Sequence, residues 1–214
     1  MIVKDISFAH AEENILYDEK LLDLAEQGLS SEILRFWEAS GFFIVLGRIS
    51  KQEAEVKTEA AAADGIKIIK RRSGGGTVLQ GPGCLNYSLI LSLEKRPALM
   101  DIKKSYELIL GKITSSFTGI GIKAEFMPLS DITLSGRKFS GNAQWRRKKY
   151  MLHHGTILYR FPIERIEKYI KMPPAEPPYR KGRSHSEFLT NINISAAEIK
   201  KSFGKAFTGE AVRI

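Results

Sequence analysis

The chain has 214 residues, of which 43% are hydrophobic and 27% are charged. This composition supports a packed core and excludes wholesale disorder. No apolar run approaches the roughly 20 residues that span a bilayer, and the N-terminus lacks the basic start and apolar stretch of a secretory signal. The single cysteine excludes an internal disulfide framework and an all-cysteine metal site. We therefore expect a soluble cytoplasmic protein that forms one domain over residues 1–214.

The net charge of +9 is distributed unevenly along the chain. Residues 1–66 contain 13 acidic and 6 basic side chains, whereas residues 67–214 contain 11 acidic and 27 basic ones. The second part therefore has a net charge of +16 and is expected to attract an anionic partner. A nucleic acid, a nucleotide and an acidic protein all satisfy this requirement, so charge alone does not choose between them.

The first third of the chain alternates between helix and strand signals. Apolar periodicity predicts an amphipathic helix over residues 11–28, and β-like runs follow at 33–37 and 42–46. An Ala- and Glu-rich helix is predicted over residues 53–63, before Asp64 and Gly65. A strand over residues 66–70 then leads into a glycine cluster.

The remaining two thirds contain more strands and two further helix signals. A strand is predicted at 87–93 and a helix at 101–117. Closely spaced short strands from 122 to 159 indicate mainly antiparallel pairing, because hairpins need only short loops. A short helix is predicted at 162–170, and Ser195 is expected to cap a last helix. This order predicts an α+β fold with a mixed, mainly antiparallel sheet and flanking helices.

The glycine cluster is the first candidate for a binding site. Successive glycines allow positive φ angles and a close approach of the backbone to a ligand, and successive N–H groups together with neighbouring arginines suit an anion. A glycine-rich hairpin without a ligand is the alternative. The glycine spacing differs from dinucleotide and phosphate-loop signatures. The residues concerned are Arg71, Ser73, Gly74, Gly75, Gly76, Thr77, Val78 and Leu79.

Lys138 is the second candidate, because small residues follow it. Ser140, Gly141 and Ala143 leave room for a ligand beside the ammonium group. The alternative is an ordinary solvated surface lysine. A third stretch carries the adjacent His153 and His154. Adjacent residues of a strand point to opposite faces, so we predict no metal site formed by this pair.

Together, these stretches resemble the lipoate–protein ligase family, which shares its catalytic fold with biotin–protein ligases and octanoyltransferases. The resemblance covers most of residues 10–160 and includes weaker matches at Asn14, Trp37 and Gly47–Arg48. It implies a biotin-ligase-like, class II synthetase-type catalytic domain. It is carried by Arg71 with Ser73-Gly74-Gly75-Gly76-Thr77-Val78, by Gly136-Arg137-Lys138-Phe139-Ser140-Gly141-Asn142-Ala143-Gln144, and by His153-His154-Gly155-Thr156.

The resemblance implies a two-step reaction. Lipoate reacts with ATP, assisted by Mg²⁺ on the phosphates, and the lipoyl group then passes to a lysine of an acidic acceptor domain, such as a 2-oxoacid dehydrogenase E2 or the glycine cleavage H protein. Lys138 matches the catalytic lysine, and Arg71 with Gly76–Leu79 matches the nucleotide-binding segment. Gly74 and Gly75 fall in the lipoate-binding loop. The remaining positions expected to line the site are Ser73, Asn86, Asp131, Ser140, Gly141 and His154.

One departure from the family pattern leaves two alternatives open. Members that work alone usually carry a C-terminal accessory domain, for which residues 160–214 are too few. A separate accessory subunit is therefore one expectation, and transfer of preformed acyl groups is the other. The second route uses Cys84 as an acyl-thioester nucleophile, although burial is the usual state of a free cysteine. We favour the ligase.

Nucleic-acid binding is the alternative from a different class of function. It rests on the basic clusters at residues 146–149 and 180–183. Aromatic residues are few around these clusters, and no helix-turn-helix or zinc pattern appears. We interpret the clusters instead as a docking surface for an acidic acceptor domain.

Overall fold

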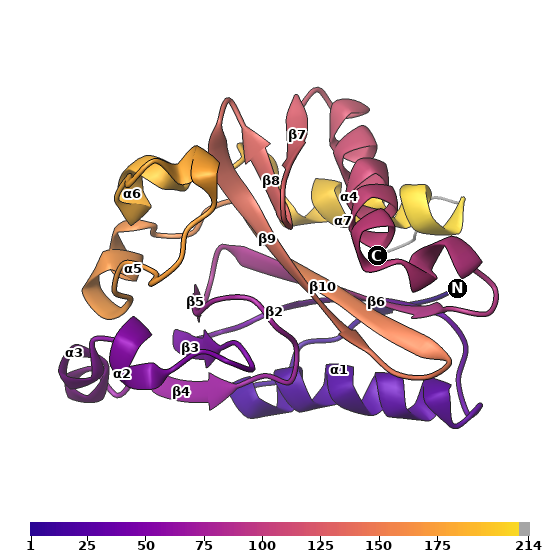
Figure 1. The fold of residues 1–214 in the computed structure, drawn as a ribbon, viewed down its shortest axis with the longest axis horizontal. Coiled ribbons are helices and arrows are strands. Elements are labelled where there is room, and N and C mark those ends of the chain that lie inside the picture. The colour runs from indigo at the N-terminus through magenta and orange to yellow at the C-terminus, as the bar shows by residue number, and fades with distance from the viewer. Residues whose placement is uncertain (210–214) are drawn as a thin grey trace.

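The computed structural model describes residues 1–209 and consists of two sheets with helices packed around them (Figure 1). A seven-stranded sheet has the order β1-β2-β6-β10-β9-β8-β7, and a three-stranded sheet has the order β4-β3-β5. The strands are β1 (Ile2–Asp5), β2 (Ile33–Glu38), β3 (Phe43–Leu46), β4 (Lys67–Lys70), β5 (Val78–Gln80), β6 (Cys84–Ser92), β7 (Ala124–Met127), β8 (Asp131–Leu134), β9 (Arg137–Arg146) and β10 (Tyr150–Leu158).

Helices flank both sheets. They are α1 (Ala11–Glu26), α2 (Gln52–Glu55), α3 (Thr58–Ala63), α4 (Ile102–Thr118), α5 (Glu164–Tyr169), α6 (His185–Phe188) and α7 (Ala196–Thr208), with 3-10 turns η1 (Pro97–Met100) and η2 (Pro178–Arg180). Within residues 1–209, no helix has the length and apolar character needed to cross a bilayer.

The large sheet is built around β6, whose nine residues are all buried. Strand β6 pairs antiparallel with β2 and β10, and β9 and β10 form a long hairpin across the molecule (Figure 1). The pair β1–β2 is parallel, and the remaining pairs of this sheet are antiparallel. The predicted α+β class with a mixed, mainly antiparallel sheet is therefore confirmed.

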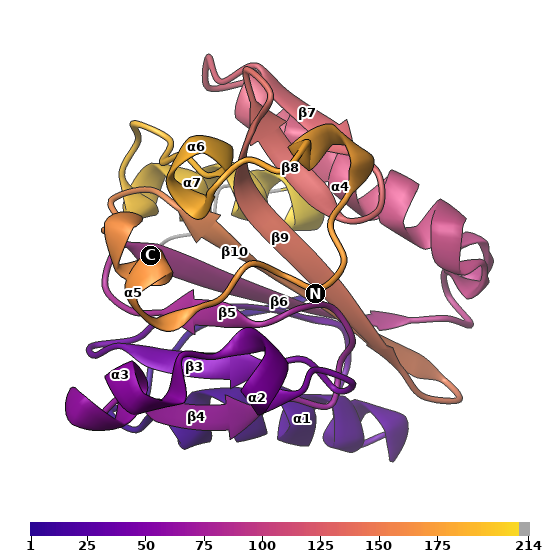
Figure 2. The same ribbon diagram turned by 60° about the vertical axis from the view of Figure 1, so that its left-hand side comes forward.

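The two faces of the large sheet have different partners. Helices α4 and α7 cover one face and enclose the largest apolar cluster, which contains Phe36, Tyr87 and Phe203. Helix α1 packs on the other face through Leu21, Leu22 and Ala25. The small sheet lies beside α1 (Figure 2), and α2 and α3 lie at its left-hand end in Figure 1. The face shared by α1, the small sheet and β9–β10 is where most of the predicted site residues lie.

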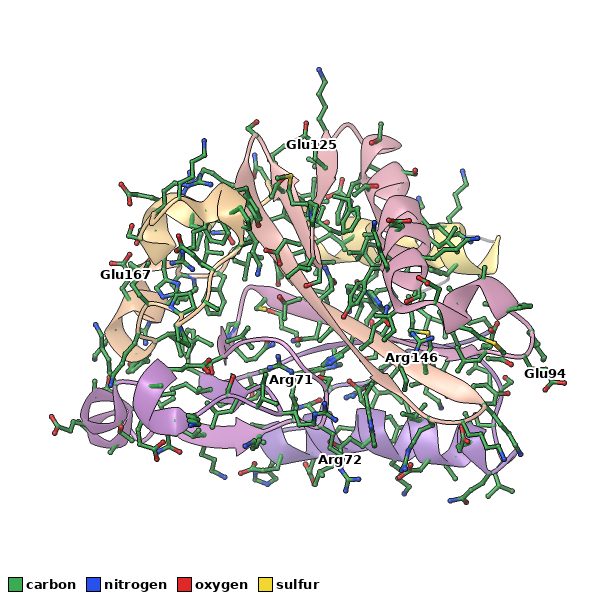
Figure 3. The ribbon with its side chains drawn as sticks, viewed as in Figure 1. Arg71, Arg72, Glu94, Glu125, Arg146 and Glu167 are labelled. Atoms are coloured by element: carbon green, nitrogen blue, oxygen red, sulfur yellow. The ribbon has the colours of Figure 1, made fainter. Side chains whose placement is uncertain are left out.

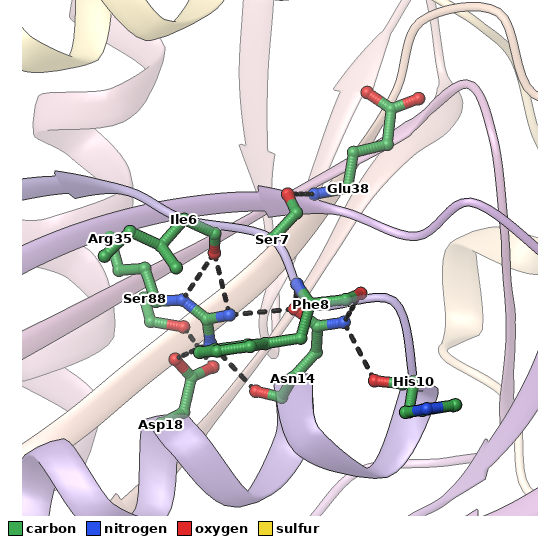
Figure 4. A network of polar contacts seen from close by, with 9 residues as sticks. All are labelled: Ile6, Ser7, Phe8, His10, Asn14, Asp18, Arg35, Glu38 and Ser88. Carbon is green, nitrogen blue, oxygen red and sulfur yellow. Dashed lines mark hydrogen bonds and ion pairs between the residues drawn. The ribbon is translucent and has the colours of Figure 1, made fainter.

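A buried ion pair fixes α1 to this face. The Arg35 guanidinium of β2 lies 2.7 Å from Asp18 Oδ1 and also donates to the carbonyl oxygens of Ile6 and Asn14 (Figure 4). Ser88 of β6 donates to the second carboxylate oxygen of Asp18 at 2.5 Å. A buried charge pair is tolerated when further hydrogen bonds satisfy both groups, as they do here. The network therefore sets the position of α1 above β2 and β6.

Several predicted elements differ from the structure. The helix expected over residues 53–63 is wrong, because the chain breaks between α2 and α3 at Val56. This side chain is fully buried and its backbone bridges to Ile170. The strands expected to be short between 122 and 159 include β9 with ten residues and β10 with nine. The small sheet was not predicted, although β3 and β4 were. The helix over 101–117 and the Ser195 cap are confirmed.

Candidate active site

Arg71 organises the glycine loop from within. Its guanidinium donates to the carbonyl oxygens of Gly74 at 2.7 Å, Gly76 at 2.9 Å and Val45 at 3.3 Å. Burial lowers the pKa of Arg71 to about 10, which still leaves the group protonated near pH 7. The loop between β4 and β5 is thus curled around a buried cation. Figure 3 places Arg71 near the centre of the molecule and Arg72 nearer to α1.

Two glycines allow the loop to adopt this shape. Gly75 has a φ of +84°, a conformation that favours glycine. A Cβ atom at Gly47 would lie 1.8 Å from the Gly75 carbonyl oxygen, so the segment before Ser50 and the glycine loop touch through their backbones. A side chain at either position would displace the loop. The positive φ expected in the triple glycine is therefore present at Gly75, and the close approach that the structure shows is to protein backbone.

Ser73 and His154 connect the loop to the large sheet. Ser73 Oγ lies 2.6 Å from His154 Nε2 and accepts a hydrogen bond from Arg71 Nε at 3.0 Å. Burial, followed by the nearby Arg71 charge, lowers the pKa of His154 to about 3. The imidazole is therefore neutral near pH 7, and Ser73 donates to Nε2 when the ring proton is on Nδ1. This arrangement places a neutral hydrogen-bonding group beside the loop.

Lys138 lies on β9 and forms an ion pair with Asp131 of β8. Lys138 Nζ is 2.7 Å from Asp131 Oδ1, and the lysine side chain is 26% exposed. A Cβ atom at Gly141 would lie 2.9 Å from both Cε and Nζ of Lys138. The absence of a side chain at Gly141 therefore lets the lysine lie over β9, so the space that was expected to hold a ligand beside the ammonium is occupied at Gly141 by the lysine itself.

The lysine and the glycine loop lie over the same face of the large sheet. Gly141 and Ala143 are two residues apart on β9, so they share a face and are separated by about 7 Å. A Cβ atom at Gly75 would lie 3.9 Å from Ala143 Cβ, and Ala143 pairs with His154 across the hairpin. The structure thus brings Lys138, Asp131, His154 and the glycine loop together.

A small cavity adjoins the loop on the side of α1. Its volume is about 20 Å³, and its walls include Ile15, Leu152, Trp145, Arg72, Ser73 and His154. The Arg72 guanidinium lies 5.3 Å from the Trp145 ring centre and forms an ion pair with Glu19 at 3.0 Å. This volume holds about one water molecule, so an acyl chain requires the walls to move apart. The contact between Arg72 and Trp145 lies on the exposed side of the cavity wall.

A polar network supports the strand segment around Lys138, residues 136–144, from the opposite face of the large sheet. Tyr87 Oη donates to Asn142 Oδ1 at 2.6 Å, and Asn142 Nδ2 donates to the Ser130 carbonyl oxygen at 2.8 Å. A Cβ atom at Gly155 would lie 1.8 Å from Asn142 Oδ1, so the glycine after the paired histidines makes room for this amide. The network fixes the segment that leads into Asp131.

Two predicted positions do not lie on the face of Lys138. Ser140 is buried on the opposite face of β9, where it contacts Asn142. Leu79 is part of the apolar cluster behind the loop. Asn86 pairs with Thr156, which in turn pairs with Gly141, so its side chain shares the face of Gly141, where it is buried and donates to Gln80 Oε1 at 3.0 Å.

Glu55 holds the glycine loop in place and was not among the residues expected at the site. Its Oε2 atom accepts hydrogen bonds from the Thr77 N–H at 3.1 Å, the Thr77 hydroxyl at 2.7 Å and the Ser50 hydroxyl at 3.0 Å. Glu55 thus fixes the far end of the glycine loop, where Val78 begins β5. In the sequence it is one of several glutamates in an Ala- and Glu-rich run, so no local signal distinguishes it.

Cys84 lies in the apolar cluster between β6, β10 and α5, with 1% of its surface exposed. Burial, followed by the charge of Glu38, raises the pKa of its thiol far above the ordinary value. The thiol therefore remains protonated and out of contact with solvent. The arrangement gives no support to Cys84 as the nucleophile of the transfer route.

Arginines of the two basic clusters have partners within the protein. Arg146 donates to the Leu99 carbonyl oxygen, and Arg147 pairs with Asp23. Arg180 is 4% exposed, and Arg183 donates to the Gly136 carbonyl oxygen at 3.2 Å. These contacts bear equally on both interpretations of the clusters, nucleic-acid binding and docking of an acidic domain, because the same arginines serve both. His153 and His154 contact opposite faces, as predicted, because His153 bonds to Gln144 whereas His154 bonds to Ser73.

Comparison with known proteins matches the chain to one family model. The model, described as "Lipoyl protein ligase A/B catalytic domain", matches residues 10–208. The chain is 29% identical to the probable lipoate-protein ligase A of Mycoplasma pneumoniae, over 74% of this chain and 45% of that protein. It is 28% identical to octanoyltransferase LipM of Carboxydothermus hydrogenoformans, over 94% of this chain and 82% of that protein. The chain spans about half the length of the ligase relatives.

Solved structures share the fold. A lipoate-protein ligase A bound with ATP superposes with a TM-score of 0.83 at 22% identity, covering 97% of this chain and 84% of that one. A bi-partite ligase from Thermoplasma acidophilum, solved with its E2 lipoyl domain, gives 0.78 at 20% identity over 97% and 82% of the two chains. A biotin acetyl coenzyme A carboxylase synthetase from Helicobacter pylori, with bound biotinylated ATP, gives a TM-score of 0.53 at 14% identity over 98% of this chain and 75% of that one. The expected biotin-ligase-like fold is confirmed.

Proposed function

Because the chain belongs to the lipoyl protein ligase A/B catalytic domain family, we propose that it is a lipoate–protein ligase. It activates lipoate with ATP to lipoyl-AMP and transfers the lipoyl group to a lysine of an acceptor lipoyl domain. The observation that carries this proposal is the placement of Lys138 and the glycine loop over one face of β9. A cation and a set of backbone groups then flank the surface where two anions must meet.

In the first step, an oxygen of the lipoate carboxylate forms a bond to the α-phosphorus of ATP, and pyrophosphate leaves. Two anions at about 4 Å repel by several kcal/mol at a partly dry site. Lys138 lowers this repulsion and stabilises charge that develops on the phosphoryl oxygens. Mg²⁺ on the phosphates supplies further positive charge when bound. Arg71 acts at this step by holding the loop rather than by contact, since its guanidinium is occupied by carbonyl oxygens.

In the second step, the ε-amine of the acceptor lysine attacks the carbonyl carbon of lipoyl-AMP. An amide bond forms, the bond to the phosphate oxygen breaks, and AMP leaves while the amine loses a proton to solvent. An acyl-adenylate hydrolyses readily, so water has to be excluded from the cleft. Trp145, Leu152 and the neutral His154 form the uncharged part of the adjoining cavity wall, beside the charged side chains of Asp18, Glu19, Arg71 and Arg72.

The ligase proposal is tested by incubating the protein with lipoate, ATP and Mg²⁺. Pyrophosphate release and an acceptor carrying one lipoyl group are expected. Lys138→Ala should lower the rate by about 100-fold or more, because a preorganised charge at the reacting centre is removed. Lys168→Ala is the matched control, since Lys168 pairs with Asp64 outside the site. Full activity of Lys138→Ala would refute the assignment of this lysine.

Removal of the metal gives a separate test of the nucleotide chemistry. With EDTA in excess, pyrophosphate release should stop and return when Mg²⁺ is restored, because the metal neutralises the phosphates during the displacement. Lipoate-dependent pyrophosphate release that persists in EDTA would contradict the proposed role of Mg²⁺.

ATP-independent octanoyl or lipoyl transfer is the second candidate function. It is favoured by the alignment with LipM, which covers 82% of that octanoyltransferase. The burial of Cys84, the one cysteine in the chain, favours the ligase, because an acyl-thioester needs an accessible thiolate. Intact-protein mass spectrometry distinguishes the two. An acyl adduct formed without ATP and lost in Cys84→Ser would establish the transferase.

The acceptor is proposed to be an acidic lipoyl domain, such as that of a 2-oxoacid dehydrogenase E2 or the glycine cleavage H protein. We further propose that residues 1–214 form one catalytic domain and that a separate accessory subunit assists adenylation. The Thermoplasma ligase is bi-partite by its own description. Adding candidate partner chains to the pyrophosphate assay tests whether an accessory subunit assists adenylation. Acceptor binding that is insensitive to salt would contradict electrostatic docking.

A further inference from the structure

The carboxylate that binds Lys138 is shared with a second donor. Asp131 Oδ1 is 2.7 Å from Lys138 Nζ, while Asp131 Oδ2 accepts a hydrogen bond from Tyr179 Oη, also at 2.7 Å. The two donors come from different parts of the chain, since Tyr179 belongs to the turn η2. Each carboxylate oxygen therefore has its own partner, and rotation of the carboxylate would break at least one contact.

Tyr179 is held in place as a hydrogen-bond donor. Its ring packs against Phe188, with 5.2 Å between the ring centres. Burial, followed by the negative charge of Asp131, raises the pKa of the Tyr179 phenol well above its ordinary value. The phenol thus keeps its proton over the physiological pH range and donates to the carboxylate.

The segment that carries Tyr179 also contacts the backbone around Lys138. We call residues 178–190 the C-terminal strap. The Thr190 N–H donates to the Lys138 carbonyl oxygen at 2.9 Å. The Arg183 guanidinium bridges the carbonyl oxygens of Tyr179, at 2.9 Å, and Gly136, at 3.2 Å. The strap therefore fixes the backbone of Lys138 directly and its side chain through Asp131.

We propose that Tyr179 is a positioning residue for Lys138, acting through Asp131. A lysine side chain has four flexible methylene groups, and an ion pair alone restricts it weakly because the carboxylate can also rotate. The phenol hydrogen bond fixes the carboxylate, and the carboxylate fixes the ammonium above Gly141. This inference rests on the proposed function, since adenylation is the step that needs the lysine at one place.

Tyr179→Phe tests the inference with two measurements. The first is the steady-state rate of lipoate-dependent pyrophosphate release. The second is the rate at which acetic anhydride labels the Lys138 amine, read by peptide mass spectrometry, which does not depend on any enzymatic activity. The substitution removes one oxygen and keeps the ring that packs on Phe188.

Loss of one hydrogen bond to a charged group should lower kcat by about tenfold in Tyr179→Phe. The KM values for lipoate and ATP should remain within about twofold, because the substrate contacts are unchanged. Lys138 should be labelled several-fold faster, since its amine spends more time away from the carboxylate. Asp131→Asn, which removes the ion pair itself, should increase the labelling at least as much.

Tyr169→Phe is the matched control. Tyr169 Oη donates to Asp64 Oδ2 at 2.5 Å, and Lys168 pairs with the same carboxylate outside the site. This variant loses the same type of bond and should keep wild-type kcat and wild-type labelling of Lys138. Wild-type kcat and labelling in Tyr179→Phe would overturn the inference, as would unchanged labelling combined with a lower melting temperature. If the wild type releases no pyrophosphate, the proposed function fails while the labelling still decides the positioning role.

Discussion

Acid is expected to destabilise this protein through two buried histidines. Burial lowers the pKa values of His153 and His154 to about 3, from the ordinary value of 6.5. Between these values the unfolded chain binds a proton at each imidazole and the native protein does not. The free energy of unfolding therefore falls as the pH falls through this window, and it is fully restored above pH 6.5.

The size of this loss of stability follows from how far the pH falls below the ordinary histidine pKa of 6.5. Each pKa unit corresponds to 1.36 kcal/mol, so each histidine contributes a loss of about 2 kcal/mol on going from pH 7 to pH 5. The pair contributes about 4 kcal/mol, a large part of the 5–15 kcal/mol typical of a folded domain. Burial raises the pKa values of Asp18 and Glu19, which acts in the opposite direction.

Urea unfolding at pH 7, 6 and 5 measures this effect in the wild type and in His153→Gln and His154→Gln. Each variant should lose about 2 kcal/mol less than the wild type over this range, because one titrating group is gone. Asp18 and Glu19 are common to all three proteins, so the differences between them isolate the histidines. A wild type and two variants with the same pH dependence would refute the assignment of neutral, buried imidazoles.

Two further predictions concern glycine and arginine. Gly155→Ala should lower the free energy of unfolding by about 2–4 kcal/mol, because its Cβ atom would displace Asn142 and break the Tyr87 hydrogen bond. Gly111→Ala is the control, because a Cβ atom at this helical position of α4 meets no neighbouring atom, and it should raise the free energy of unfolding by about 0.5–1 kcal/mol. Equal changes of the free energy of unfolding in the two variants, measured by urea unfolding, would contradict the packing argument. Arg71→Lys should lower pyrophosphate release at least about tenfold, because one ammonium cannot bridge both glycine carbonyl oxygens. Retained activity in Arg71→Lys would show that the pair of hydrogen bonds from the guanidinium to the two glycine carbonyl oxygens is dispensable.

Local signals predicted the parts of the site that depend on neighbours in the sequence. The glycine cluster predicted a positive φ, which Gly75 adopts, and the small residues after Lys138 predicted open space beside the lysine, which Gly141 provides. The alternation of side chains along a strand correctly assigned His153 and His154 to opposite faces of the large sheet. In each case the deciding interaction involves residue type and strand alternation, which a sequence displays directly.

The contacts that complete the site join distant segments. Glu55 reaches Thr77 across 22 positions, and Tyr179 reaches Asp131 across 48. Neither residue is unusual for its local composition, so only the fold reveals its partner. The misplaced helix over residues 53–63 has the same origin, because burial of Val56 against Ile170 overrides local helix propensity.

The buried position of Cys84 has a consequence for the sulfur chemistry of the proposed substrate. The dithiolane of lipoate is a cyclic disulfide, and an exposed thiolate attacks such a bond to form a mixed disulfide. The chain's one sulfhydryl is protonated and shielded by apolar side chains, so it does not enter this exchange. The proposed acyl substrate would therefore meet no free thiolate from this cysteine.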